Sequence, residues 1–341
     1  MTDQDPRRFL LVASPRTGSN LLLKILALED QPNVATCKNG GYFFMPLVLL
    51  KQELRCAWKN VEQFSKDERD KIGIGMKRCF NELDQHIKCA ISSGKLVFVK
   101  EHANFLTDPV AKTQFIYGEE SVTQELPWMI KGSDEVVQTT SRSIHNKTIL
   151  SDEFLRSWNP VFLIKHPALS FPSFYRASVR ADGQEFMNSI PGRRSCHMVM
   201  TMRWIRKLYD FYSEYFTESK HQTVQANGDD IWPIILDADD VIDKPAVLVK
   251  LCNLIGLDSG LLRYEWEPSS QARPLWAQAF RTTLDSSTRI IATKAAGDID
   301  IDEEVKKWKE EFGEEIGDMI EKYVRDAIPD YEFLKSKRLR G

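Results

Sequence analysis

The sequence has no excess of charge of either sign and no apolar run long enough to cross a membrane. Its 46 Lys and Arg residues stand against 49 Asp and Glu residues, so the formal net charge is -3. A protein that binds nucleic acid through its overall field is usually basic. The longest apolar run, at residues 42–50, falls well short of the roughly 20 residues of a membrane helix. We therefore expect neither nucleic acid nor membrane as a partner.

The sequence also lacks paired cysteines, internal repeats and Pro-, Gly- or Ser-rich linkers. Its six cysteines are scattered singly, so neither a disulfide framework nor a four-ligand metal site is indicated. His86 with Cys89, and Cys196 with His197, have ligand-like spacing without a second half-site, and we expect no metal. The first residues carry acids and lack the long apolar segment of a signal peptide. These features predict a reduced, cytoplasmic protein.

Short apolar runs alternate with longer helical patterns. The apolar runs, typical of strands buried on both faces, are at residues 9–13, 95–100, 160–165 and 232–237. Helical patterns are at residues 21–28, 202–216, 247–255 and 305–323, with Gly256 as an expected helix C-cap. This alternation predicts an α/β fold, with a parallel sheet flanked by helices on both faces and ligands at the carboxyl ends of its strands. We expect a single domain over residues 1–341, with weakly periodic lid insertions near 103–157 and 262–300.

The segment after the first apolar run, SPRTGSN at residues 14–20, has the pattern of a phosphate cradle. Gly18 permits a tight backbone path, the following amides can bind an anion at a helix start, and Arg16 adds a cation. The residues predicted to bind are Arg16, Thr17, Gly18, Ser19 and Asn20. The loop is not a Walker A motif because it lacks GK[ST]. An ordinary strand–helix turn with a serine cap is the alternative interpretation.

Two motifs resemble those of sulfotransferases that use PAPS (3′-phosphoadenosine 5′-phosphosulfate). PRTGSNLL is similar to the family's 5′-phosphosulfate loop, in the Arg form of bacterial and tyrosyl-protein members. Lys165, after the third apolar run, and Ser173, eight residues later, match the family's 3′-phosphate motif with Lys in place of Arg. The resemblance implies a P-loop-like sulfotransferase fold, PAPS as cofactor and PAP as product. A surface lysine and a helix cap are the alternative for this pair.

The second apolar run ends in Lys100-Glu101-His102. Residues two apart share a strand face, so we expect Lys100 and His102 to project together and Glu101 to point away. The Lys-x-His pattern resembles that of the cytosolic members, which implies that His102 takes the acceptor's proton. Residues 36–44 lack the glutamate that other members use instead. Arg16 and Lys100 are implied to stabilise charge on the transferring group, and a histidine held in the core is the alternative.

Weaker matches lie later in the chain and among the aromatic residues. Residues 235–257 resemble a family segment whose adenine-contacting Tyr is replaced here by Ala238. Lys294 or Arg289 is either a 3′-phosphate ligand or a solvated loop cation. Aromatic residues that could pack the core or line an acceptor pocket are Tyr42, Phe43, Phe44, Phe115, Tyr117, Trp128 and Trp158.

The sequence thus predicts a PAPS-dependent sulfotransferase that modifies a hydroxyl or amine of a small acceptor, aromatic or partly apolar. A nucleotide-dependent kinase or NTPase is an alternative, with Asp237, Asp239 and Asp240 as magnesium ligands. A protein that keeps the fold for other chemistry, or only for binding, is another. The sequence identifies neither the acceptor nor the oligomeric state.

Overall fold

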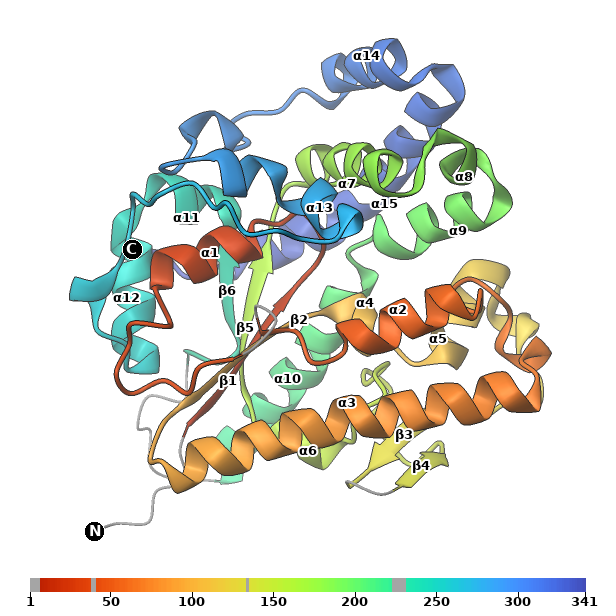
Figure 1. Cartoon of the computed structure of the whole chain (residues 1–341), viewed down its shortest axis with the longest axis horizontal. Coiled ribbons are helices and arrows are strands. Elements are labelled where there is room, and N and C mark those ends of the chain that lie inside the picture. The colour runs from red at the N-terminus through yellow and green to blue at the C-terminus, as the bar shows by residue number, and fades with distance from the viewer. Residues whose placement is uncertain (1–6, 38–40, 133–134, 223–230) are drawn as a thin grey trace. The chain divides into compact units, whose positions relative to one another are not determined.

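The computed structural model describes residues 7–37, 41–132, 135–222 and 231–341. Residues 1–6 and 38–40, which entered the expectations about the N-terminus and the catalytic base, lie outside this described part. The fold is α/β, with a parallel sheet flanked by helices (Figure 1). Within the described ranges, no helix is long and apolar enough to span a bilayer.

The chain divides into two compact units. Unit 1 comprises residues 1–13, 33–162 and 204–234, and unit 2 comprises residues 14–32, 163–203 and 235–341. The elements of unit 1 are β1 (Arg8–Ala13), α2 (Met45–Glu53), η2 (Val61–Gln63), α3 (Lys66–Ser92), β2 (Val97–His102), α4 (Ala103–Leu106), α5 (Pro109–Tyr117), η3 (Glu119–Ser121), β3 (Trp128–Lys131), β4 (Glu135–Gln138), α6 (Asp152–Arg156), most of β5 (Asn159–Ile164) and most of α10 (Arg203–Gln222). Those of unit 2 are α1 (Ser19–Leu26), α7 (Pro167–Asp182), α8 (Gln184–Asn188), α9 (Ile190–Val199), most of β6 (Ile234–Asp237), α11 (Ala238–Asp243), α12 (Pro245–Ile255), η5 (Ser259–Leu261), α13 (Leu275–Ser286), η6 (Ala292–Lys294), α14 (Ile301–Phe312) and α15 (Glu314–Ser336).

The four predicted strands are confirmed. Among the described residues they form a sheet in the order β2-β1-β5-β6, and β1 pairs with β2 in parallel. Phe9, Leu11 and Val12 of β1 are fully buried, as a strand covered on both faces requires. β2 begins two residues later than the apolar run and extends to His102, whose register partner is Ala13 at the end of β1.

Two of the predicted helices show why local signals succeed or fail. α12 ends where expected, at Gly256 in the left-handed conformation with φ 77°. The single helical stripe expected over residues 305–323 is wrong, because Gly313, with φ 84°, separates α14 from α15. A positive φ ends a helix, whereas the apolar spacing on either side of Gly313 remains compatible with one.

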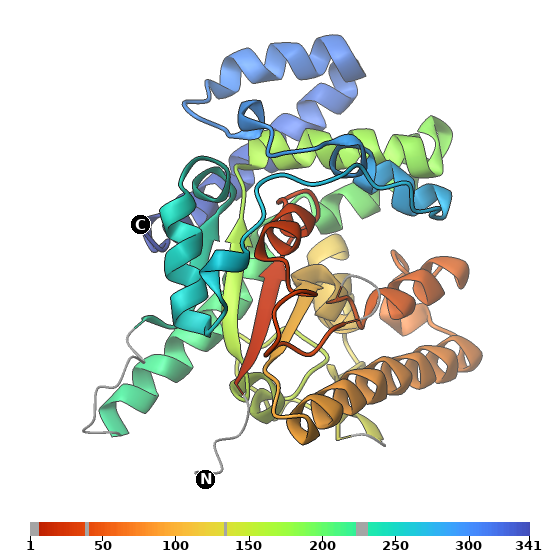
Figure 2. The same cartoon turned by 60° about the vertical axis from the view of Figure 1, so that its left-hand side comes forward.

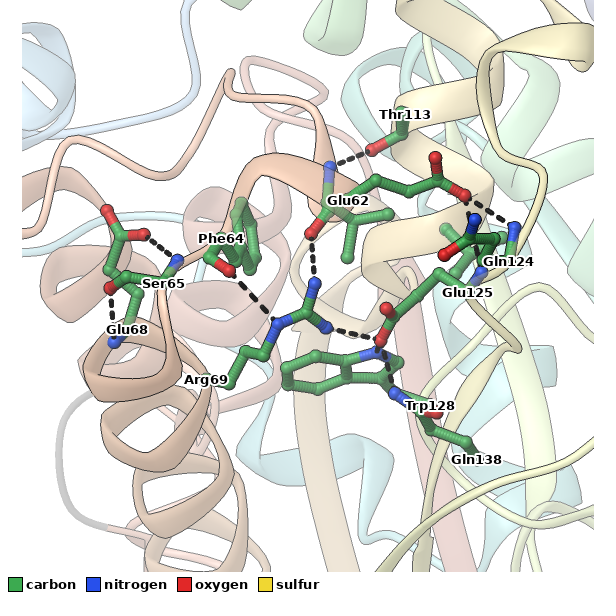
Figure 3. A network of polar contacts seen from close by, with 12 residues as sticks. Glu62, Phe64, Ser65, Glu68, Arg69, Thr113, Gln124, Glu125, Trp128 and Gln138 are labelled. Atoms are coloured by element: carbon green, nitrogen blue, oxygen red, sulfur yellow. Dashed lines mark hydrogen bonds and ion pairs between the residues drawn. The ribbon is translucent and has the colours of Figure 1, made fainter.

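The segment predicted as the first lid, residues 103–157, contains α4, α5, the hairpin β3–β4 and α6. The hairpin lies along the long helix α3 in both views (Figures 1 and 2). Figure 3 shows the polar network that joins them: Arg69 of α3 donates to Glu125 at 2.6 Å, and the same carboxylate accepts from the Trp128 indole at 2.8 Å. Arg69 also donates to the backbone carbonyls of Val61 and Phe64. The lid function of both segments, and the single-domain organisation, stay predictions.

Candidate active site

The loop between β1 and α1 has the backbone of an anion cradle, and it lies within unit 2. Arg16 and Gly18 both have positive φ, 69° and 89°, so the loop is tightly wound. α1 begins at Ser19, and no side chain caps it. The serine-capped turn that competed with the cradle is therefore not formed. The first amides of α1 point toward the N-terminal end of the helix, where the dipole attracts an anion.

Not every predicted residue of the cradle faces outward. The Thr17 hydroxyl donates to the Ser14 carbonyl at 2.9 Å, and the Thr17 amide donates to the same oxygen at 3.4 Å. Thr17 and Ser19 are buried. A Cβ added to Gly18 would meet no atom within 4 Å, so the loop leaves open space at this point. Thr17 therefore shapes the turn, while the space beside Gly18 and the start of α1 remain for a ligand.

Arg16 and Ser173, which are 157 positions apart in the sequence, are in direct contact. Arg16 Nε donates to Ser173 Oγ at 3.0 Å, and Arg16 Nη1 donates to the Phe280 carbonyl of α13. Burial lowers the pKa of Arg16, and the charge of Arg180 lowers it further. Ser173 lies inside α7 and not at its cap, which is His166. The structure thus brings together two residues that the sequence assigned to different phosphates.

Lys165 stands at the end of β5, directly before α7, in the same unit. Its ammonium donates to the Lys294 carbonyl at 3.0 Å, so the structure places Lys294 beside it. The backbone of Arg289, in the same unit, forms an isolated antiparallel bridge with Glu265. Burial lowers the pKa of Lys165, Asp239 opposes that effect, and the charges of Lys294 and Arg16 add to it.

The three carboxylates considered as magnesium ligands accept hydrogen bonds from other residues of unit 2. Asp237 is the N-cap of α11 and accepts from the Asp239 amide in the first turn of that helix and from the Tyr331 hydroxyl, both at 3.0 Å. Asp239 accepts from the Ala296 amide at 2.8 Å. Asp240 accepts from two cations, Lys244 at 2.7 Å and Arg338 at 2.8 Å. These contacts give all three acids structural roles.

Lys100 and His102 project from the same face of β2, as expected, and meet Tyr42 in unit 1. Tyr42 Oη lies 2.8 Å from His102 Nε2, and the Lys100 ammonium lies 4.1 Å from the centre of the Tyr42 ring. Phe105 packs against both rings, at 5.7 Å from Tyr42 and 4.9 Å from His102. Glu101 faces the other way, so the alternation of the strand separates its chemistry from that of the other two.

Burial sets the protonation states along this strand end. It lowers the pKa of His102 to about 3, and the neighbouring Lys100 charge acts in the same direction. It raises the pKa of Glu101 to about 8, although the amides of Phe43 and Phe44 donate to Glu101 Oε1. His102 is therefore neutral at neutral pH, the state in which it can accept a proton.

The sequence predictions missed how these residues are linked. Tyr42 entered only as one aromatic residue among several, and Glu101 only as the residue that points away. The contact of Tyr42 with His102 joins positions 60 residues apart and has no local signal. The hydrogen bonds from the Phe43 and Phe44 amides, just before α2, to Glu101 are likewise long-range contacts. The sequence can show that Lys100 and His102 stand at the end of a strand, where a site is expected. It cannot show that Tyr42, from another part of the chain, contacts them.

Comparisons with known proteins identify the family. The chain is 41% identical to "Sulfotransferase ppzF" of Metarhizium rileyi, over 98% of this chain and 97% of that protein. It is 40% identical to "Sulfotransferase ppzF" of Metarhizium majus, over 98% of both. Among solved structures, the sulfotransferase domain of the Synechococcus PCC 7002 olefin synthase aligns with a TM-score of 0.39 and 12% identity. The alignment covers 91% of this chain and 96% of that domain's chain. No family model matches the sequence. The full-length similarity to the two Metarhizium proteins shows that this chain belongs to the sulfotransferase family.

Proposed function

We propose that the chain transfers a sulfuryl group from PAPS to a hydroxyl or amine of a small organic acceptor. The observation that carries the proposal is the hydrogen bond between Arg16 and Ser173 at the entrance to an uncapped α1. Guanidinium, ammonium, hydroxyl and helix amides are the donors that bind phosphate and sulfate. Unit 2 collects all four kinds within one group of residues.

These donors fit the two anionic ends of PAPS, which supplies an activated sulfuryl group when bound. We assign Arg16, Gly18, Ser19 and Asn20 to the 5′-phosphosulfate, with Thr17 holding the turn. Lys165 and Ser173 are assigned to the 3′-phosphate, together with Lys294. Because Arg16 touches Ser173, a single guanidinium lies between the two groups.

In unit 1, we propose that His102 is the base for the acceptor's proton and that Lys100 stabilises the charge that develops during transfer. Ala13 pairs with His102 in the β1–β2 register, and the cradle loop begins at the next residue, Ser14. Oriented donors and a positioned base account for most of the rate in such transfers.

The acceptor and the compartment are part of the same proposal. Tyr42 and Phe105 surround His102 with apolar ring surface, which favours an aromatic or partly apolar acceptor. The six cysteines are all unpaired, as in the reducing cytoplasm. A metal ion has no role in this proposal, since side-chain cations serve the anions.

Ligand binding tests the proposal without an acceptor. PAP should raise the thermal midpoint, because it binds the native state and not the unfolded chain. When the PAP concentration is a hundred times its Kd, binding should increase the free energy of unfolding by about 2.7 kcal/mol. ATP with magnesium should give a much smaller shift in the same assay. A larger shift with ATP and magnesium than with PAP would assign the site to a kinase or NTPase instead.

A further inference from the structure

We propose that Tyr42 is a further catalytic residue, which takes the acceptor's proton while its own hydroxyl proton passes to His102. This inference rests on the proposed sulfotransferase reaction and changes which atom meets the acceptor. His102 Nε2 already contacts Tyr42 Oη, at 2.8 Å. An acceptor hydroxyl therefore finds the phenol first and the imidazole behind it.

Burial distinguishes the two side chains. His102 is 8% exposed, whereas Tyr42 is only half-buried. The neutral imidazole that this burial enforces can accept a proton at Nε2, and the opposing hydroxyl is placed to donate it. Tyr42 is thus the more accessible member of a pair whose buried member is the proton acceptor.

The surroundings of the Tyr42 ring favour negative charge on its oxygen during transfer. The Lys100 ammonium lies 4.1 Å from the ring centre, where a cation is attracted to the π face. The same cation stabilises the ring as the hydroxyl gives up its proton. Phe105 contacts both rings and holds the phenol and the imidazole in one arrangement. Lys100 therefore acts on the base as well as on the transferring group.

The proton and bond changes balance. The acceptor's O–H bond breaks and its proton goes to Tyr42 Oη, while the Tyr42 O–H proton goes to His102 Nε2. The acceptor oxygen forms its bond to sulfur, and the bond between sulfur and the bridging phosphate oxygen breaks with the electron pair leaving on that oxygen. Tyr42 ends as a neutral phenol and His102 as an imidazolium, which then loses its proton to solvent.

The kinetic test compares Tyr42→Phe with wild type on phenols of different acidity. Tyr42→Phe should lower kcat by about 10²–10⁴ for a weakly acidic phenol such as 4-methylphenol. The loss should shrink for 4-nitrophenol, because an acceptor that ionises by itself needs less help from a base. Affinity for PAP, measured by calorimetry, should stay within about twofold. Equal losses for both phenols would reduce Tyr42 to packing and overturn the proposal.

The control variant is Tyr212→Phe. Tyr212 donates its hydroxyl to the Leu155 carbonyl at 2.9 Å, so the variant also loses one tyrosine hydrogen bond in unit 1. It should keep wild-type kcat on both phenols. If the wild-type protein does not bind PAP, the proposed function is contradicted. If it binds PAP but Tyr42→Phe affects both phenols equally, only the role of Tyr42 is contradicted.

A second measurement needs no turnover. In ¹⁵N spectra of the free protein, Nε2 of His102 should shift when Tyr42→Phe removes the hydroxyl, because a nitrogen lone pair that accepts a hydrogen bond differs from one that does not. The Tyr212→Phe spectrum should match wild type. An unchanged His102 signal in Tyr42→Phe would show that the phenol does not donate to the imidazole, and the relay would be refuted.

Discussion

The guanidinium of Arg16 contacts Ser173 Oγ and the Phe280 carbonyl, so a single residue ties the cradle loop to α7 and α13. Because of this contact, the two assigned phosphate sites are neighbours. Substitutions can distinguish the contribution of one site to nucleotide binding from that of the other. Ser173→Ala removes a hydroxyl that we assign to the 3′-phosphate. The binding free energy of PAP should become less favourable by roughly 1.5–3 kcal/mol, the contribution of a hydrogen bond to a charged group. Adenosine 5′-phosphosulfate lacks that phosphate, so its affinity should fall much less in the same calorimetric titration.

Ser170→Ala is the matched control for this prediction. Ser170 lies on the same helix and donates its hydroxyl to the His166 carbonyl at 3.3 Å, within α7 itself. Its loss should leave the affinity for both nucleotides unchanged. If Ser173→Ala weakens the two nucleotides equally, Ser173 serves the 5′ side through Arg16, and the 3′-phosphate site has been misplaced.

Among single residues, those at the carboxyl end of a strand are the ones that the sequence predicts best. Lys100, His102 and Lys165 could be named because parallel strands end in their ligand-binding residues, and Gly18 because a tight turn needs it. The binding and catalytic roles of these residues stay predictions, although their places in the fold are now known. Tyr42 could not be assigned, because its distance from His102 depends on how the chain closes over 60 residues.

Among the elements, α5 depends on one buried carboxylate. Asp108 caps α5 by accepting from the Val110 and Ala111 amides, accepts from the Trp128 amide of β3 and pairs with Arg142 at 3.2 Å. Asp108 is completely buried. Asp108→Ala leaves Arg142 without this partner and frees three backbone donors. We expect a loss of about 3–5 kcal/mol in the free energy of unfolding, measured with denaturant.

Asp300→Ala provides the comparison. Asp300 caps α14 by accepting from the Asp302 and Glu303 amides, but it is exposed and water can replace it. Its removal should cost about 1 kcal/mol. Similar losses for both variants would show that the cap alone matters, and that the contacts of Asp108 with Arg142 and β3 contribute nothing further.

Element types could be predicted from the sequence more reliably than element limits. The alternation of apolar runs and helical patterns predicted the four strands because burial on both faces forces nearly continuous apolar sequence. The expected strand already included Lys100, Glu101 and His102, although all three are polar, whereas its start was expected at residue 95 and lies at Val97. Their polarity is tolerated in a buried strand because Lys100 and His102 contact Tyr42, while Glu101 accepts backbone amides at the start of α2. The paired hairpin β3–β4 carried no clear pattern at all.

At the scale of the whole molecule, the buried ionisable groups give the unfolding free energy a characteristic pH dependence. Burial raises the pKa of Glu101 from 4.5 to about 8, against the amides of Phe43 and Phe44 and the charge of Lys100, which lower it. Between these values the native state holds a proton that the unfolded chain releases. The contribution of Glu101 is therefore complete below about pH 4.5 and is lost as the pH rises through 8. His102 acts in the opposite direction and only below its unfolded value of 6.5.

The interval between pH 7 and 8 isolates the effect of Glu101 from that of His102. There Glu101 should lower wild-type stability by up to about 1.4 kcal/mol per pH unit, and Glu101→Gln should remove that component because an amide does not titrate. Glu62→Gln is the control: Glu62 also accepts backbone amides, from Thr123 and Gln124, but its pKa is lowered by them. Its carboxylate is ionised in both states above pH 7, so this variant should keep the wild-type slope. Denaturant unfolding of the three proteins at several pH values in this interval measures the difference. Parallel slopes for wild type and Glu101→Gln would mean that Glu101 is ionised in the native protein, with its charge held by the two amides and Lys100.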